Sequence, residues 1–142
     1  MKKILFLLSL ILSTIAFAQE FSTVTELPDY EAIKIKLKLD ENVFTKADTP
    51  AEFPDGMDTF KRKFAESMDI IDVKTNKINT RVYFVVEKTG YVRYVTATGN
   101  DKKHSQAAEV AVRRLFVKWK PAMINGEPVR FLYTFPLSLK KY

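Results

Sequence analysis

The C-terminal third of the sequence contains the pattern that most restricts the fold. From residue 129 to 137, every second side chain is aromatic or aliphatic, which is the period of a β-strand and not of a helix. The residues that share this face are Val129, Phe131, Tyr133, Phe135 and Leu137. Pro136 has no N–H to donate, so the strand should be an edge strand, at least near its end. We therefore predict a final strand that is left open on one side.

The residues before this strand indicate a helix, a stop and a turn. A helix is expected from about residue 105 to 118, because apolar side chains recur there with helical spacing. Its apolar stripe consists of Ala108, Ala111, Val112, Leu115 and Trp119. Pro121 cannot continue the helix, and Asn125 with Gly126 marks a turn before the strand. We interpret Trp119 as a core residue beneath the sheet.

Two further β-rich segments predict a hairpin. Residues 80–87 and 91–98 consist largely of β-branched and aromatic residues. The short link between them ends at Gly90, which can adopt the positive φ that such a turn needs. The first segment is more continuously apolar, so we place it in the middle of the sheet.

A second helix is expected ahead of the hairpin, after a turn punctuated by Pro54 and Gly56. Its apolar face is formed by Met57, Phe60, Phe64 and Met68. The resulting order is helix, strand, strand, helix, strand. It predicts an α+β fold: a three-stranded antiparallel sheet with two helices on one face, in which the last strand pairs with the first.

Residues 33–39, IKIKLKL, alternate strictly between apolar side chains and lysines. This period of two predicts an extra N-terminal edge strand, with its lysines facing solvent. The alternative is an arm that pairs with another edge of the same protein and must be displaced by a partner. A membrane-surface role is less consistent with a strand-type repeat.

The N-terminus has the pattern of a signal peptide, and we divide the chain accordingly. Two lysines precede an apolar run, and Ala16-Phe17-Ala18 fits the small-x-small cleavage pattern. The rival interpretation is an uncleaved anchor, but the run is shorter than the roughly 20 residues that span a bilayer. We predict a cleaved signal peptide at 1–18, an arm and connector at 19–49, and a folded domain at 50–142. The absence of cysteine excludes disulfides and thiolate chemistry.

Five segments, in this order and spacing, resemble the TonB C-terminal domain in the stand-alone exported form of Bacteroidetes-type bacteria. The resemblance covers about residues 50 to 140. Its segments are 51–57 (AEFPDGM), 84–92 (FVVEKTGYV), 107–115 (AAEVAVRRL), 118–122 (KWKPA) and 125–130 (NGEPVR). The residues that carry the structural motif are Phe53, Pro54, Gly56, Gly90, Trp119, Pro121 and Gly126.

The resemblance implies a periplasmic protein-binding function. In that family the domain adds a short extended segment of an outer-membrane transporter, the TonB box, to the edge of its last strand, and thereby serves energy-dependent transport. The partner-binding residues carried over are Val129, Arg130, Phe131, Leu132, Tyr133, Thr134, Phe135 and Leu137. Arg130, Leu132 and Thr134 should face away from the aromatic row.

The chain departs from that family in ways that leave a second function open. A transducer needs a retained anchor and a long proline-rich spacer, whereas Pro28 is the only proline before Pro50. We therefore do not expect it to transmit force from the inner membrane by itself. The alternative is a self-associating structural or accessory domain, its edge strand occupied by its own arm or a second copy.

The sequence offers no catalytic, cofactor-binding or metal-binding residues that we can single out. His104, the only histidine, is expected at the surface, and no nucleophile motif accompanies it. The basic runs at 61–63 and 113–114 lack the interleaved aromatic residues of single-strand nucleic-acid binders. We thus predict a non-enzymatic protein without nucleic-acid or small-molecule partners, which contacts membranes only through its protein partners.

Overall fold

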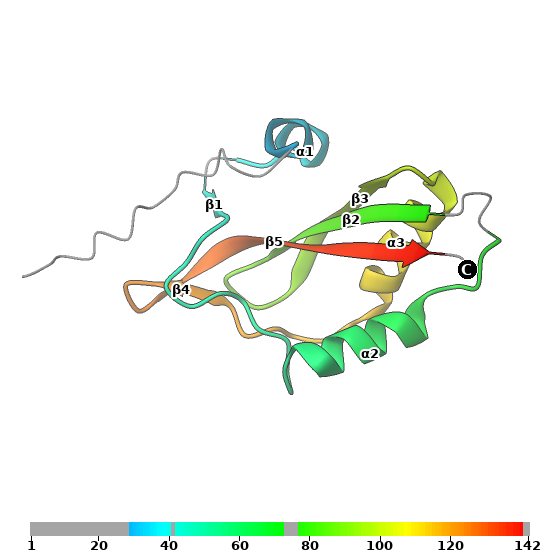
Figure 1. The fold of residues 1–142 in the computed structure, drawn as a ribbon. Coiled ribbons are helices and arrows are strands. Elements are labelled where there is room, and N and C mark those ends of the chain that lie inside the picture. Colours follow the sequence, from blue (N-terminus) through cyan, green and yellow to red (C-terminus); the bar gives the residue numbers. More distant parts are fainter. Residues whose placement is uncertain (1–28, 41, 73–76, 141–142) are drawn as a thin grey trace, which may run out of the picture.

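A computed structural model describes residues 29–40, 42–72 and 77–140, apart from the side chains of 139 and 140. The predicted signal peptide therefore lies outside the described residues. The chain forms a mixed α+β fold with an open sheet (Figure 1). The elements are α1 (Tyr30–Leu37), β1 (Val43–Phe44), α2 (Met57–Ser67), β2 (Lys77–Val86), β3 (Val92–Gly99), α3 (Lys102–Arg114), β4 (Ala122–Ile124) and β5 (Glu127–Lys140).

The sheet has five strands rather than the three expected. Its order is β1-β5-β2-β3, and β4 pairs separately with β5. The hairpin of β2 and β3 and the central place of β2 are confirmed, because β2 pairs antiparallel with both β3 and β5. Of the two unexpected strands, only β1 lies on the outer side of β5, and β4 pairs with the other side of this strand (Figure 1). The last strand is therefore an edge strand over only part of its length.

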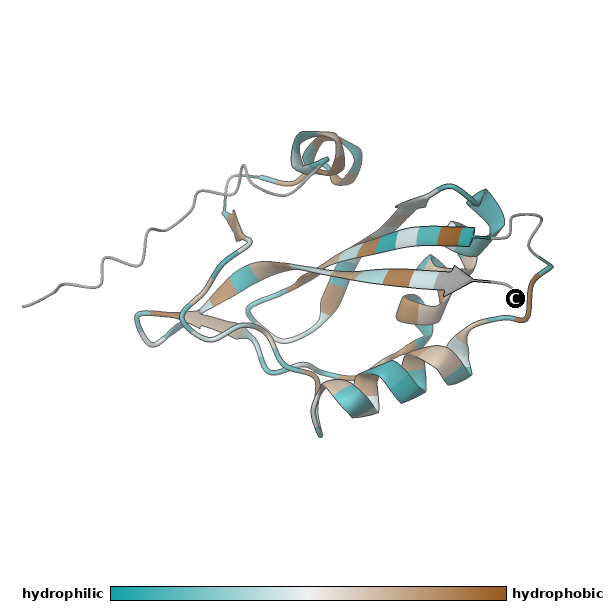
Figure 2. Cartoon of the chain, viewed as in Figure 1, coloured by the Kyte–Doolittle hydropathy of each residue, from teal (hydrophilic) through white to brown (hydrophobic). Residues whose placement is uncertain are grey.

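One face of the sheet is covered by α2 and α3, as the two apolar stripes predicted. Phe60 and Phe64 of α2 join Ala108, Ala111 and Val112 of α3 in a core against β2. Brown apolar residues mark this inner side of both helices in Figure 2. Helix α3 begins and ends a few residues earlier than expected, at Lys102 and Arg114.

Trp119 lies at the centre of this core, as predicted, and is only 3% exposed. Its indole packs edge-on against the rings of Phe53 and Phe84, with ring centroids 5.3 Å apart in each pair. Its backbone N–H donates to the carbonyl of Gly90 at 2.9 Å. A Cβ on Gly90, whose φ is +88°, would lie 2.1 Å from the Trp119 carbonyl oxygen. Glycine is thus required at this turn both by its φ and by the close approach of the other chain segment.

The opposite face of the sheet is covered by α1, and here the sequence-based prediction was wrong. Residues 30–37 form a helix, not the edge strand expected from the alternation at 33–39. The helix buries Tyr30 and Ile33 against Tyr83, Val85 and Leu132, together with Leu39 and Val43. Ile35, which a strand would place beside Ile33, is 75% exposed.

The physical reason for this error is a second pattern within the same residues. Tyr30, Ile33 and Leu37 are spaced by three and four positions, which places them on one side of a helix. The second face of β2 and β5 carries large apolar side chains that need cover, and burial of that face outweighs local β-propensity. The N-terminal strand is instead the two-residue β1, farther along the chain.

Candidate functional site

The outer edge of β5 is the only long stretch of strand backbone that the resemblance singled out, and the chain itself covers its first part. Glu127 to Val129 pair with β4, which lies on the other side of the strand. Arg130 and Phe131 pair in parallel with Val43 and Phe44 of β1. Beyond Phe131, no strand of the described residues pairs with this side of β5. On its outer side, the predicted partner-binding strand is therefore divided: 130–131 is covered by β1, and 132–137 is open toward the described residues.

The orientation of the open backbone follows from Pro136. It lies opposite Arg81 of β2, and proline is tolerated in a ladder where its nitrogen faces away from the neighbouring strand. Because successive backbone groups alternate in direction, Thr134 and Ser138 then present their N–H groups outward as well. These groups are a template on which another extended chain can pair.

The side chains of β5 alternate between the two faces as predicted. Tyr133, Phe135 and Leu137 join the core beneath α2 and α3. Leu132 joins the cluster under α1, and the hydroxyl of Thr134 accepts a long hydrogen bond from Arg81 at 3.5 Å. A chain that paired with the open edge would inherit this alternation, with every second side chain directed toward α2.

A cleft of about 750 Å³ lies where those side chains would go, between α2 and the C-terminal half of β5. Its walls are largely apolar: Met57, Phe60, Phe64, Met68, Phe135 and Leu137. These walls are well packed, because the ring of Phe135 stands edge-on to those of Phe60 and Phe64, at centroid distances of 5.2 Å. The Tyr133 hydroxyl donates to the Met57 sulfur at 3.2 Å.

Three ionisable side chains line the same cleft: Lys61, Asp69 and His104. Lys61 and Asp69 are exposed at its rim. Asp69 pairs with Arg114 at 2.7 Å, and this hydrogen bond lowers the pKa of the Asp69 carboxyl below its ordinary value. His104 differs from both, because only 2% of it is exposed.

His104 was expected at the surface, and that expectation was wrong. Asp101 caps α3 by accepting a hydrogen bond from the backbone N–H of His104 at 2.9 Å, so the helix starts early and His104 faces the sheet. Its Nδ1 lies 2.7 Å from the hydroxyl oxygen of Thr80. Burial lowers the pKa of the imidazole, and the charge of Asp101 opposes this only in part. The spacing of His104 to Ala108 and Ala111 already placed it on the apolar stripe.

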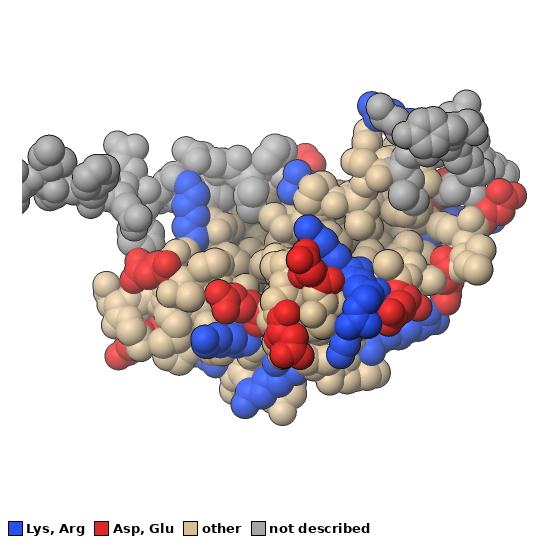
Figure 3. Space-filling model, turned by 60° about the horizontal axis from the view of Figure 1, so that its bottom comes forward, with Lys and Arg blue, Asp and Glu red and all other residues tan. Residues whose placement is uncertain are grey.

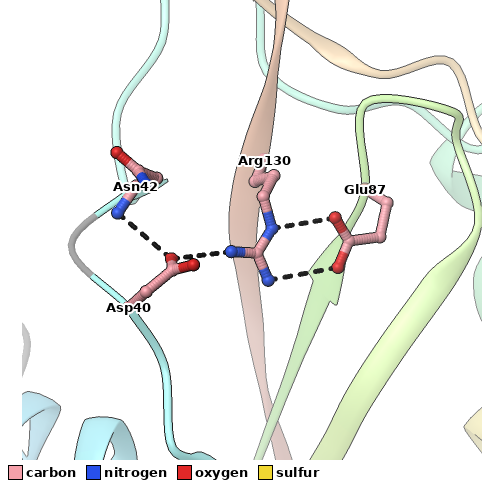
Figure 4. A network of polar contacts seen from close by, with 4 residues as sticks. All are labelled: Asp40, Asn42, Glu87 and Arg130. Carbon is pink, nitrogen blue, oxygen red and sulfur yellow. Dashed lines mark hydrogen bonds and ion pairs between the residues drawn. The ribbon is translucent and has the colours of Figure 1, made fainter.

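On the other face of the sheet, Arg130 is held in an ion-pair network that sequence reasoning missed (Figure 4). Its guanidinium donates to both carboxylate oxygens of Glu87, at 2.8 and 3.2 Å. It also donates to Asp40, at 2.7 Å, from the segment that leads into β1. Hydrogen bonding to Glu87 raises the pKa of Arg130 above its ordinary value. Arg130 therefore fastens the N-terminal segment to β5 and is not free to bind a partner.

The opposite edge of the sheet, β3, is less suited to pairing. Its register with β2 shifts between Tyr83 and Val85. On β3 itself, Tyr94 adopts a positive φ of 55°. Such a bulge bends an edge strand and disrupts the row of groups that another strand would meet. The regular open edge of this sheet is therefore the C-terminal half of β5.

Over the part of the chain that the structure describes, no three His, Asp or Glu side chains gather closely enough to hold a metal ion. Within those same residues, the helices are too short or too polar to cross a bilayer. On the face seen in Figure 3, lysine and arginine side chains are interspersed with acidic ones. A scan against protein-family models and searches of curated proteins and solved structures find no match. The resemblance to the TonB C-terminal domain stays a prediction.

Proposed function

We propose that this protein is a non-enzymatic binding module that receives an extended peptide segment of another protein along the open half of β5. The single observation that carries the proposal is the coincidence of two features. Among the described residues, no strand pairs with the outer side of β5 beyond Phe131, and the apolar cleft beside α2 follows the same strand from Phe135 to Ser138. Backbone groups and a side-chain cleft together are what strand addition uses.

In this arrangement, affinity and selectivity come from different parts of the site. The outward N–H groups of Thr134 and Ser138, and the carbonyls between them, form main-chain hydrogen bonds with any extended peptide. Alternate peptide side chains enter the cleft between α2 and Phe135, where apolar groups are favoured by about 25 cal/mol per Å² buried. The peptide should therefore alternate between apolar and polar residues.

The resemblance to the TonB C-terminal domain supplies the proposed partner and location. We propose the finer fold assignment as well: a TonB-like core of three strands and two helices, formed by β2, β3 and β5 with α2 and α3. We propose that the protein acts in the periplasm after removal of residues 1–18. Its partner is a TonB box-like segment of an outer-membrane transporter, and the module serves energy-dependent transport across that membrane as an accessory.

A second candidate is self-association, which one observation favours: β1 of this same chain already occupies part of the outer edge of β5. Pro136 weighs against pairing of β5 with a second copy. A two-fold arrangement brings that residue into the ladder twice, and each copy lacks one N–H there. Sedimentation velocity separates the candidates, since self-association predicts a concentration-dependent dimer in the absence of peptide.

The test of the proposal is a titration of the isotope-labelled mature protein with TonB box-like peptides, followed by amide chemical shifts. Binding should move the resonances of 132–138 and of the α2 residues that line the cleft. A matched series carries one N-methyl group at successive peptide positions. Because only alternate N–H groups face β5, N-methylation should weaken binding at every second position and have little effect between them. Shifts that are absent from β5, or an effect without alternation, would refute strand addition.

A further inference from the structure

We propose that His104 is a specificity-determining residue of this cleft and that its Nε2 hydrogen-bonds the hydroxyl of a tyrosine on the bound peptide. The inference rests on the proposed function and adds to it the identity of one peptide side chain. It concerns the inner end of the cleft, where α3 and the end of α2 meet β5.

The first support is an unused hydrogen-bonding atom in a buried position. Thr80 takes Nδ1 of the imidazole, and within the described part of the chain no hydrogen bond engages Nε2. His104 is nevertheless 98% buried, as its 2% exposure implies, and it lines the cleft. A buried polar atom without a partner costs about 1–3 kcal/mol. A ligand that supplies the missing hydrogen bond is thereby favoured over one that does not.

The second support is the distance from the open edge. Thr80 lies opposite Leu137 in the register of β2 and β5, so His104, which bonds to Thr80, sits one strand inward of β5. A peptide paired on the outer side of β5 would be two strand spacings from β2, or roughly 10 Å. Serine and threonine carry their hydroxyl too close to the backbone to cross the space beneath Leu137. Tyrosine carries it at the far end of the ring.

The third support is the chemistry of the walls and of the imidazole. Phe64, Met68 and Leu137 line the same cleft as His104, and such apolar walls suit an aromatic ring. Burial lowers the pKa of His104 below its ordinary value, which favours the neutral imidazole. A neutral imidazole pairs well with a neutral hydroxyl, whereas a carboxylate or ammonium group would be desolvated there without an opposite charge. Tyrosine supplies both the aromatic ring and the neutral hydroxyl.

The experiment compares two peptides that differ only by tyrosine or phenylalanine at one cleft-facing position of a TonB box-like sequence. Each position is tried in turn, by calorimetry at pH 7.5. At the position nearest Leu137, the tyrosine peptide should bind the wild-type protein about tenfold more tightly, the usual value of one satisfied buried hydrogen bond. Equal affinities at every position, with β5 shifts intact, would overturn this inference and leave strand addition standing.

Two variants separate a role in recognition from a role in folding. In His104→Gln, the side-chain amide can occupy the place of Nε2, whereas in His104→Asn it can occupy that of Nδ1 and keep the bond to Thr80. We expect the tyrosine preference to persist in His104→Gln and to vanish in His104→Asn. The reverse order would show that the bond to Thr80 alone matters and would overturn the proposal.

A measurement on the unmutated protein guards against variants that fail to fold. The ¹⁵N shift of Nε2 in wild-type His104 should change on addition of the tyrosine peptide and stay in place with the phenylalanine peptide. Identical shifts with both would refute the contact. If neither peptide moves any β5 resonance, strand addition and this inference fail together.

Discussion

Arg130→Met tests whether the ion-pair network fastens the N-terminal segment to the sheet. The Arg130 and Glu87 side chains are each 16% exposed, and the pair is bidentate, at 2.8 and 3.2 Å. Methionine keeps most of the packing of the arginine stem but leaves the Glu87 carboxylate without its counter-charge. Removing one member of a buried pair costs roughly 3–5 kcal/mol, and the residual exposure of this pair reduces the expected loss to about 2–3 kcal/mol.

The second arm of the network provides an internal comparison. Asp40 is 58% exposed where it meets Arg130 at 2.7 Å, so Asp40→Asn should cost no more than about 1 kcal/mol. This smaller effect should also diminish at high salt, because exposed pairs are screened and buried pairs are screened much less. The two substitutions therefore probe the same guanidinium through environments that differ mainly in burial.

The assay is urea unfolding of the mature protein at 25 °C, monitored by the fluorescence of Trp119. For a typical slope of about 1–3 kcal/mol per molar urea, Arg130→Met should lower the midpoint by about 0.7–3 M, with the slope unchanged. In the double variant Arg130→Met/Glu87→Gln, part of the loss should be recovered, because no unpaired carboxylate remains. Equal losses for Arg130→Met and Asp40→Asn, or a loss below about 0.5 kcal/mol for Arg130→Met, would refute this account of the network.

Three further predictions address the fold and the site. Ile33→Ala should cost about 3 kcal/mol, because Ile33 is 1% exposed; Ile35→Ala should cost less than about 0.5 kcal/mol, and equal costs would favour a strand over the helix. Gly126→Ala should cost about 1 kcal/mol through its positive φ, while Gly90→Ala should cost at least about 2 kcal/mol more because its Cβ also meets Trp119; chemical denaturation compares them. The folded state binds the His104 proton less readily than the unfolded state, whose pKa is near 6.5, so stability should fall as pH drops below that value. In thermal melts at pH 7.5 and 5, His104→Gln should show a smaller loss than the wild type; an unchanged difference would exclude His104 as the source.

The elements that the sequence predicted well are those in which one periodicity dominates. Segment 57–68 buries a single face, so its side-chain spacing and its burial agree. Segment 80–87 buries both faces, which its continuous apolar run already indicated. The same reasoning placed Phe131, Tyr133 and Phe135 on one face of the last strand. Local patterns suffice when an element has one apolar side and one partner to bury it against.

The N-terminal region failed this condition, because residues 33–39 satisfy two periods at once. A helix forms rather than a strand because α1 covers a surface made of Tyr83, Val85 and Leu132, which are distant in sequence. A two-residue strand such as β1 carries no detectable period. Its pairing with Arg130 depends on contacts with residues far along the chain. The structures of α1 and β1 are therefore determined by tertiary contacts rather than by the local sequence pattern.

The candidate site was predictable as a strand but not as a cleft. The alternation at 129–137 and Pro136 identified β5 and its orientation. The extent of the open edge could not be predicted, because it depends on how β1 folds back over the start of the strand. Likewise, the burial of His104 followed from the cap at Asp101, which sets where α3 begins.

The position of β5 between β1 and β2 has a consequence for how the chain reaches its native state. This strand is the last element of the described chain, yet it contacts elements from the whole length, including Asp40, 90 positions earlier. The β2–β3 hairpin can close within microseconds, whereas the pairing of β1 with β5 requires closure of a long loop. Folding should therefore be limited by the arrival of β5, and a chain that ends before residue 127 should expose the apolar sides of both β2 and α1. Such a chain would collapse without cooperative unfolding behaviour.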